Sequence, residues 1–257
     1  MIRGLFSAIA FLTRIPVPFS LQSRRENGMF RGYPLAGLLI GAFLAALYAG
    51  AHWLFPVPVA VVVLILGMVL LTGGLHLDGL ADCADGFYGR KDAETTLRIL
   101  KDPRIGTMGG VAIGLDLIAR FAILTTLPFR ELLIGLPLAT MLSRTAAVAG
   151  LQVLPYVRSE GGILRAASTR SSGLTVLALV VLLALGVVLP IPVAVAVIAL
   201  AVFWRISWKR IRGCTGDVLG ASIEIAEIAV LLAMSALAKL SWWGGLFPGL
   251  VGLILPR

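Results

Sequence analysis

The chain has 257 residues, of which 59% are hydrophobic and 14% are charged, and its mean hydropathy is +0.98. This composition excludes a water-soluble globule, a disordered chain and a collagen-like chain. The net charge of +9 does not indicate a nucleic-acid-binding domain, because Lys and Arg lie in short loops between apolar runs. Cys83 and Cys214 are too few for a disulfide framework and are expected to be reduced thiols.

Residues 1–15 predict an amphipathic helix at the membrane interface. Apolar side chains recur there at helical spacing, at Ile2, Leu5, Phe6, Ile9 and Leu12. The stretch is too brief for the core of a signal peptide, so we expect it to be retained.

Seven apolar runs follow that are long enough to cross a membrane, which takes roughly 20 residues with a range of about 17 to 25. Five are clear, namely 33–55, 56–74, 107–128, 131–155 and 220–239. The runs 173–189 and 191–208 form a shorter pair joined at two prolines. At ~1.5 Å per residue, each of these two just spans the hydrocarbon core.

A last run over residues 242–255 is short enough to be either an eighth crossing or a re-entrant segment. The sequence therefore predicts an all-α, polytopic membrane helical bundle of about 7 to 8 transmembrane helices. We expect the whole chain, residues 1–257, to form a single integral membrane domain.

The basic residues predict the orientation. When successive loops are assigned to alternate sides, 18 of the 22 Lys and Arg residues fall on the side of the N-terminus. The positive-inside rule places that side in the cytosol. We therefore expect an integral protein of the cytoplasmic (inner) membrane, with three longer cytosolic loops over about 75–106, 155–172 and 209–220.

Three aspartates follow the second predicted crossing. Asp78, Asp82 and Asp85 are spaced i, i+4, i+7, so a helix places their carboxylates on one face, where they repel one another. A divalent cation would relieve this repulsion, and Mg²⁺ typically binds one or two carboxylates together with substrate phosphate oxygens. The alternative is a solvated acidic loop balanced by nearby basic residues. His76 is a candidate ligand or proton carrier, or else a structural histidine.

Basic residues precede the helix that is predicted to begin near Thr107. Lys101 and Arg104 lie at its start, where free N–H groups and the helix dipole favour an anion. This arrangement predicts a phosphate site, and the alternative is a helix stop at Pro103 with basic interfacial anchors. The loop that begins at Arg158 is suited to an anionic ligand or to anionic lipid.

A third motif follows residue 212. Asp217, Glu224 and Glu227 fall on one helical face at the rim of a membrane helix, where carboxylates are costly. They predict a second carboxylate set for metal or substrate. The alternative is structural pairing with Arg120 or Arg144, which lie inside predicted helices.

Four ordered motifs between residues 11 and 227 resemble those of the cobalamin synthase family. They are Phe11-Leu-Thr-Arg-Ile-Pro-Val-Pro18, Gly73-Gly-Leu-His-Leu-Asp-Gly-Leu-Ala-Asp-Cys-Ala-Asp-Gly86, Lys101-Asp-Pro-Arg-Ile-Gly-Thr-Met-Gly109 and Thr215-Gly-Asp-Val-Leu-Gly-Ala221 with its two downstream glutamates. The chain departs from the expected pattern at Arg212, where a second glycine would precede Gly213.

The resemblance implies an adenosylcobinamide-GDP ribazoletransferase with cytosolic catalytic motifs at 75–106 and 209–227. α-Ribazole or its 5′-phosphate would displace GMP from adenosylcobinamide-GDP, giving adenosylcobalamin or its phosphate, with Mg²⁺ as cofactor. The expected metal ligands are Asp78, Asp82, Asp85, Asp217, Glu224 and Glu227. The expected catalytic residues are Asp82, Asp85, Lys101 and Arg104. The expected substrate-binding residues are His76, Arg98, Lys101, Arg104, Thr215 and Asp217.

Other classes stay open. A CDP-alcohol phosphotransferase or a prenyltransferase also has an Asp-rich, Mg²⁺-dependent site at the cytosolic mouth of a helical bundle. This chain lacks an Asp-Gly-x-x-Ala-Arg start to its acidic motif, which weighs against the phosphotransferase. A small-molecule transporter would use Asp116, Arg120 and Arg144 as an intramembrane pathway. The expected partners are the two substrates and the lipid bilayer, with no nucleic acid, and a homo-oligomer stays open.

Overall fold

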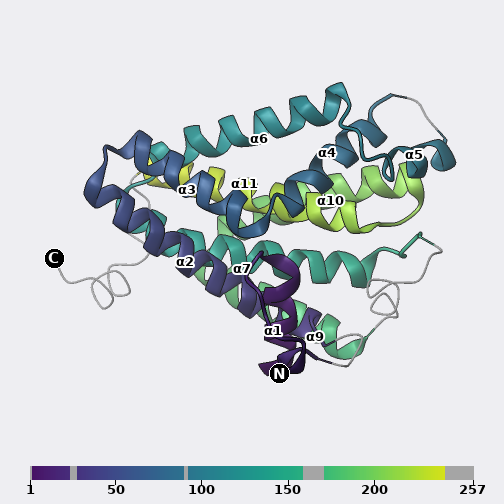
Figure 1. Ribbon diagram of the computed structural model, residues 1–257, viewed down its shortest axis with the longest axis horizontal. Helices are drawn as coiled ribbons and strands as arrows, with labels where there is room; N and C mark the ends of the chain where they lie inside the picture. Colours follow the sequence, from purple (N-terminus) through teal and green to yellow (C-terminus); the bar gives the residue numbers. More distant parts are fainter. Residues whose placement is uncertain (1, 24–27, 90–91, 159–170, 241–257) are drawn as a thin grey trace.

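The computed structural model describes residues 2–23, 28–89, 92–158 and 171–240. These residues form ten α-helices and two short 3-10 helices (Figure 1). The α-helices are α1 (Ile2–Leu12), α2 (Tyr33–Leu54), α3 (Val57–Thr72), α4 (Leu75–Phe87), α5 (Ala93–Ile99), α6 (Thr107–Thr126), α7 (Phe129–Val153), α9 (Ser172–Val188), α10 (Pro190–Ile211) and α11 (Gly216–Lys239). The 3-10 helices are η1 (Phe19–Leu21) and η2 (Phe30–Gly32). The predicted all-α class is confirmed, and the run 242–255 lies outside the described residues.

Prolines and glycines set the ends of the apolar helices. Pro56 and Pro128 stand at the N-caps of α3 and α7, where the fixed φ of proline suits a helix start. Gly73 ends α3 in the left-handed conformation, with φ 65°. The predicted runs 33–55 and 107–128 match α2 and α6, because these signals are local.

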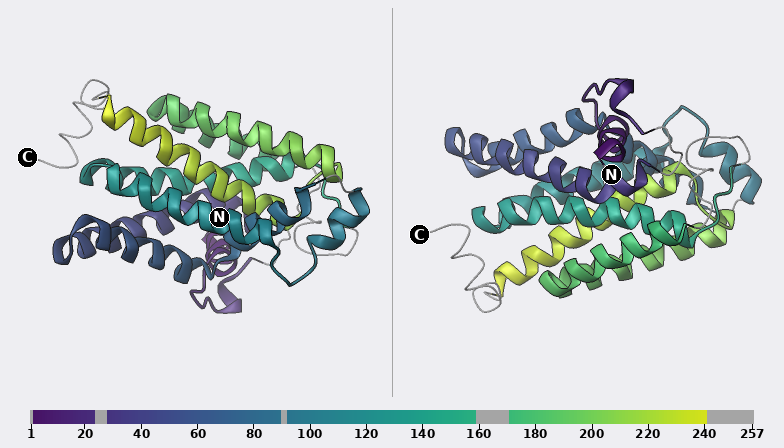
Figure 2. Two further views of the ribbon diagram at one scale, coloured as in Figure 1. Left: turned by 90° about the horizontal axis from the view of Figure 1, so that it is seen from above. Right: turned by 90° about the horizontal axis from the view of Figure 1, so that it is seen from below.

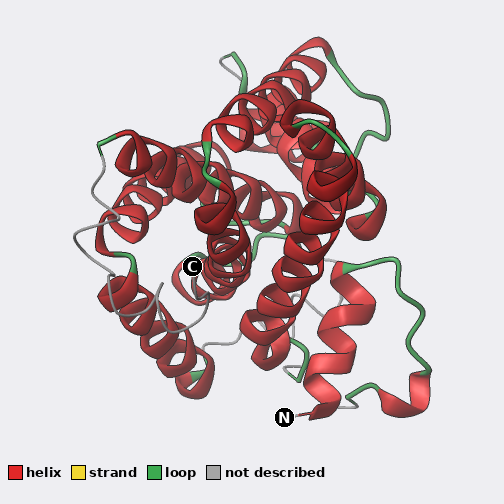
Figure 3. Ribbon diagram, turned by 90° about the vertical axis from the view of Figure 1, so that its left-hand side faces the viewer, coloured by secondary structure: helices red, strands yellow, loops and turns green. Residues whose placement is uncertain are grey.

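Helices α7 and α11 form the centre of the bundle. Helix α2 packs along α7, and α11 packs against α4, α7 and α10. The long helices lie side by side along the longest axis in Figures 1 and 2, and Figure 3 shows the bundle from one end. Cys83 and Cys214 are buried free thiols, as predicted.

Five described helical segments are long and apolar enough to cross a membrane. They are Phe30–Leu54, which contains α2, and the helices α6, α7, α10 and α11. A sixth span results if α3 and α4 form one broken span, since the two helices are bent by 87°. Helix α9, with 17 residues, is a shorter apolar helix. Several apolar spans therefore agree with the predicted polytopic membrane class.

The predicted N-terminal helix forms as α1 and packs on the bundle. Its buried residues are Gly4, Ser7, Ala8 and Leu12. It contacts α2 and both 3-10 helices. Helix α1 is therefore part of the tertiary structure as well as amphipathic.

A short parallel bridge ties the end of α7 to the turn before α11. The bridge pairs Tyr156 with Cys214, and the Cys214 N–H donates to the Pro155 carbonyl over 2.8 Å. Arg212 in the preceding turn has φ 58°, in the left-handed region that favours glycine. This conformation explains why glycine is expected at position 212.

Candidate active site

Asp78 and Asp217 line the same pocket. The pocket has a volume of about 140 Å³ and is lined by residues of α1, η2, α2, α4, α7 and α11. Helices α4 and α11 approach closely there because Gly79 has no side chain. A Cβ atom at Gly79 would lie 2.8 Å from the carbonyl oxygen of Asp217. The close approach brings carboxylates from two distant motifs to one pocket.

Asp82 lies one helical turn beyond Asp78, among several carboxylates. Helix α4 is bent away from α3 and lies outside the five long apolar segments. Burial and the negative charges of Asp217, Asp78 and Asp85 raise the pKa of Asp82 to about 7, while Arg158 acts in the opposite direction. The carboxylates of Asp78, Asp85 and Asp217 therefore act on Asp82 as like charges, and a bound cation would relieve this repulsion.

Arg158 contacts this group of carboxylates. Its Nη2 donates to Oδ2 of Asp217 over 2.6 Å and to the carbonyl of Leu100 over 2.9 Å. Thr215 donates to the same carboxylate over 3.0 Å and accepts from Val218 N–H as the N-cap of α11. Thr215 is fully buried, and its hydroxyl orients the Asp217 carboxylate.

Asp85 caps the start of α6. Its two carboxylate oxygens accept from the N–H groups of Gly106, over 2.7 Å, and Gly109, over 2.9 Å. A Cβ atom at either glycine would collide with this carboxylate. These two N–H groups of the predicted phosphate site therefore bind a carboxylate of the protein, because Asp85 supplies the negative charge that the helix start favours.

Three basic side chains on or after α5 are exposed, namely Arg98, Lys101 and Arg104. Arg104 pairs with Asp102, with Nη2 to Oδ2 at 2.7 Å, and its side chain is 87% exposed. The adjacent Leu100 carbonyl is held by Arg158. This basic segment therefore lies next to the carboxylate pocket, with its charged groups at the surface.

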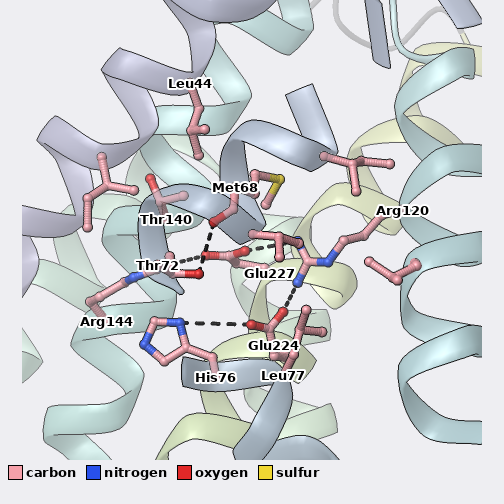
Figure 4. Close-up of a pocket in the computed structure, with 14 residues that line it drawn as sticks. Leu44, Met68, Thr72, His76, Leu77, Arg120, Thr140, Arg144, Glu224 and Glu227 are labelled. Carbon is pink, nitrogen blue, oxygen red and sulfur yellow. Dashed lines mark hydrogen bonds and ion pairs between the residues drawn. The ribbon is translucent and has the colours of Figure 1, made fainter. Parts of the chain in front are cut away.

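A second group of charges is buried between α6, α7 and α11 (Figure 4). Arg120 pairs with Asp116 over 2.8 Å, with Glu227 over 3.0 Å, and with Glu224. Arg144 pairs with Glu227. Glu224 and Glu227 are thus both paired with arginines. This arrangement agrees with the alternative from the sequence, in which these glutamates form structural ion pairs with Arg120 or Arg144.

His76 lies between the two groups of charges. It is only 3% exposed and lines both the Asp78–Asp217 pocket and a smaller cavity beside the buried ion pairs. Its Nδ1 lies 3.8 Å from Oε1 of Glu224, as drawn in Figure 4, and its Nε2 has no hydrogen-bond partner among the described residues. The smaller cavity, of about 20 Å³, has room for about one water molecule.

Within the described residues, no group of three or more His, Cys, Asp or Glu side chains could hold a metal ion by itself. Mg²⁺ needs only one or two carboxylates where phosphate oxygens and water supply its other ligands. Asp78 and Asp217 fit that requirement, since both face one pocket.

The sequence profile of the family described as Cobalamin-5-phosphate synthase matches residues 4–235. The chain belongs to this family. The cobalamin synthase membership and the transferase class predicted from the four motifs are therefore confirmed.

Three bacterial relatives named adenosylcobinamide-GDP ribazoletransferase align over nearly their full lengths. The relative from Alkalilimnicola ehrlichii is 40% identical over 246 residues, 91% of this chain and 96% of the relative. The relative from Chlorobium phaeobacteroides is 38% identical over 254 residues, which cover 93% of this chain and 100% of the relative. The relative from Klebsiella pneumoniae subsp. pneumoniae is 32% identical over 248 residues, which cover 91% of this chain and 100% of the relative. No solved structure matches this chain.

The structure divides the predicted site residues of this family member into several environments. Asp78 and Asp217 share a pocket, Asp82 lies beside them, and Asp85 caps a helix. In the sequence, Arg158 was only the start of a loop suited to an anionic ligand or lipid, far from the four motifs, and its contact with Asp217 was not predicted. Arg158 lies two residues after Tyr156. The pairing of Tyr156 with Cys214 brings Arg158 close to Asp217.

Proposed function

We propose that this protein joins α-ribazole, or its 5′-phosphate, to adenosylcobinamide-GDP with release of GMP. The family and the names of the relatives support this reaction. The observation that supports a location for the reaction is the pocket lined by Asp78 and Asp217, where Arg158 pairs with Asp217. Carboxylates for a cation and a guanidinium for phosphate are the groups that transfer from a diphosphate requires.

Asp78 and Asp217 are the proposed ligands of Mg²⁺. The donor set suits this ion, because both are hard carboxylate ligands. Burial, and after it the negative charges of Asp217, Asp78 and Asp85, raise the pKa of the neighbouring Asp82. When bound, Mg²⁺ neutralises charge on phosphoryl oxygens.

The other residues have distinct proposed roles. Arg158 binds a phosphoryl oxygen of the diphosphate, and the exposed Arg98, Lys101 and Arg104 add positive charge beside it. Asp82 accepts the proton of the ribazole hydroxyl as its oxygen bonds to the cobinamide-linked phosphorus and the bond to GMP breaks. Asp85 and Thr215 position the site, whereas Glu224 and Glu227 belong to the buried ion pairs.

The proposed membrane arrangement keeps 7 to 8 crossings of one domain, with the N-terminus and the site in the cytosol. Helices α4 and α5 and the start of α6 lie at one end of the bundle (Figure 1). The basic residues Arg98, Lys101, Arg104 and Arg158 belong to this end, and the positive-inside rule supports a cytosolic position for it.

Purified protein in nanodiscs tests the reaction. With adenosylcobinamide-GDP, α-ribazole and Mg²⁺, we expect one GMP released for each cobalamin formed, and no GMP when either substrate or Mg²⁺ is withheld. Folded protein that releases no GMP, but moves either substrate across a liposome membrane, would support the transporter instead.

A further inference from the structure

The pocket that contains Asp78 and Asp217 is otherwise mainly apolar. Helix α1 supplies Phe11 and Leu12, η2 supplies Phe30, and α7 and α11 supply Ala147 and Ile223. Four of these five side chains are almost completely buried, and Phe11, at 41%, is the exposed one. The inner wall is therefore apolar, while Asp78 is exposed and lies toward the open side.

The two substrates offer three chemically different groups to such a pocket. The corrinoid ring is far larger than about 140 Å³. Guanine carries several hydrogen-bond donors and acceptors on its edges, and the apolar wall would leave those that face it unpaired. The dimethylbenzimidazole base of ribazole is flat and largely apolar, so its burial is favourable.

The position of the charged residues also favours the dimethylbenzimidazole base as the group that the pocket binds. A nucleoside whose base lies against the apolar wall can direct its ribose hydroxyls toward Asp78 and Asp217, which line the same pocket. These carboxylates accept hydrogen bonds from hydroxyl groups. A lipid acyl chain would fill the apolar part equally well, but it has no group for the carboxylates.

We propose that the pocket lined by Phe11, Phe30, Ala147 and Ile223 binds the apolar base of the nucleoside acceptor. This assignment rests on the proposed transferase function. It makes α1, predicted only as an interfacial helix, part of the specificity site.

The test replaces Ala147 by leucine to fill space beside the base. Each variant is assayed with two acceptors, dimethylbenzimidazole riboside and benzimidazole riboside, which differ only in two methyl groups. We expect the ratio of kcat/KM for the smaller over the larger acceptor to rise at least about tenfold in Ala147→Leu. The ratio does not depend on the fraction of folded protein, because both acceptors meet the same sample.

Ala149→Leu is the matched control, since Ala149 lies on the same helix about 200° away and does not line the pocket. Its ratio should equal that of the wild type. Phe11→Ala removes a partly exposed ring and should raise KM for the dimethyl acceptor about fivefold or more, with KM for adenosylcobinamide-GDP unchanged.

An unchanged acceptor ratio in Ala147→Leu, with an active wild type, would overturn the assignment of the pocket. So would a rise in KM for adenosylcobinamide-GDP alone, which would assign the pocket to the donor. An inactive wild type with both acceptors would instead contradict the proposed function itself.

Discussion

Helix α11 carries two groups of acids in contrasting surroundings. Asp217 in its first turn lies near the aspartates of α4, and its guanidinium partner is Arg158. Glu224 and Glu227, two to three turns further on, are buried against guanidinium groups from α6 and α7. Asp217 lines a pocket with Asp78, whereas Glu224 and Glu227 are buried inside the bundle.

This contrast distinguishes carboxylates that bind from carboxylates that stabilise. A buried carboxylate paired with a guanidinium is satisfied, and removing either partner leaves an uncompensated charge. Carboxylates at a pocket that outnumber their cations retain affinity for a metal ion. The following experiments test whether the two groups of α11 behave in these two ways.

The largest expected effect is on stability, in the buried group. Replacing Arg120 by methionine removes the guanidinium partner of Asp116 and Glu224 and leaves Glu227 with Arg144 alone. We therefore expect the free energy of unfolding to fall by about 3–5 kcal/mol. Thermal melting in detergent measures this loss. Arg205→Met, at an exposed position of α10, is the control, and equal melting of the two variants would show that the pairs contribute little.

The next effect is on activity, in the pocket group. Asp82→Asn should lower kcat by about 100-fold or more, since it removes the proposed proton acceptor. Its melting temperature should not fall, because the change relieves repulsion among the carboxylates. Glu94→Gln, an exposed acid of α5, should keep full activity. Near-normal turnover of folded Asp82→Asn would remove Asp82 from the mechanism.

Arg158 should show a smaller effect, on substrate binding. A hydrogen bond to a charged group contributes about 1.5–3 kcal/mol, so Arg158→Ala should lower kcat/KM roughly 10- to 150-fold, mainly through KM for adenosylcobinamide-GDP. Arg158→Lys should recover part of the loss, because the positive charge remains. An unchanged KM in Arg158→Ala would restrict Arg158 to its pairing with Asp217.

Asp85 should show the smallest effect, because it caps a helix. Asp85→Asn should cost about 0.5–2 kcal/mol of local stability and speed amide hydrogen exchange at Gly106 and Gly109. Activity should fall less than in Asp82→Asn. A loss as large as that of Asp82→Asn, with unchanged exchange, would return Asp85 to the metal ligands.

The helices could be predicted closely because their signals are local. Run length, the prolines before α3 and α7, and the glycine after α3 depend on neighbouring residues alone. The helical spacing of Asp78, Asp82 and Asp85 was predicted correctly for the same reason. The metal-ligand roles of these residues stay predictions, as do the number of crossings and the orientation.

The sequence by itself determined the family, the helical class and the residue types that meet at the site. Only the tertiary structure decided which acids act together. Helical spacing treats Asp217, Glu224 and Glu227 alike, yet one borders a pocket with Asp78 and two are paired with arginines. Spacing along one helix cannot distinguish them, because their partners belong to other helices and the electrostatic environment depends on distances that only packing sets.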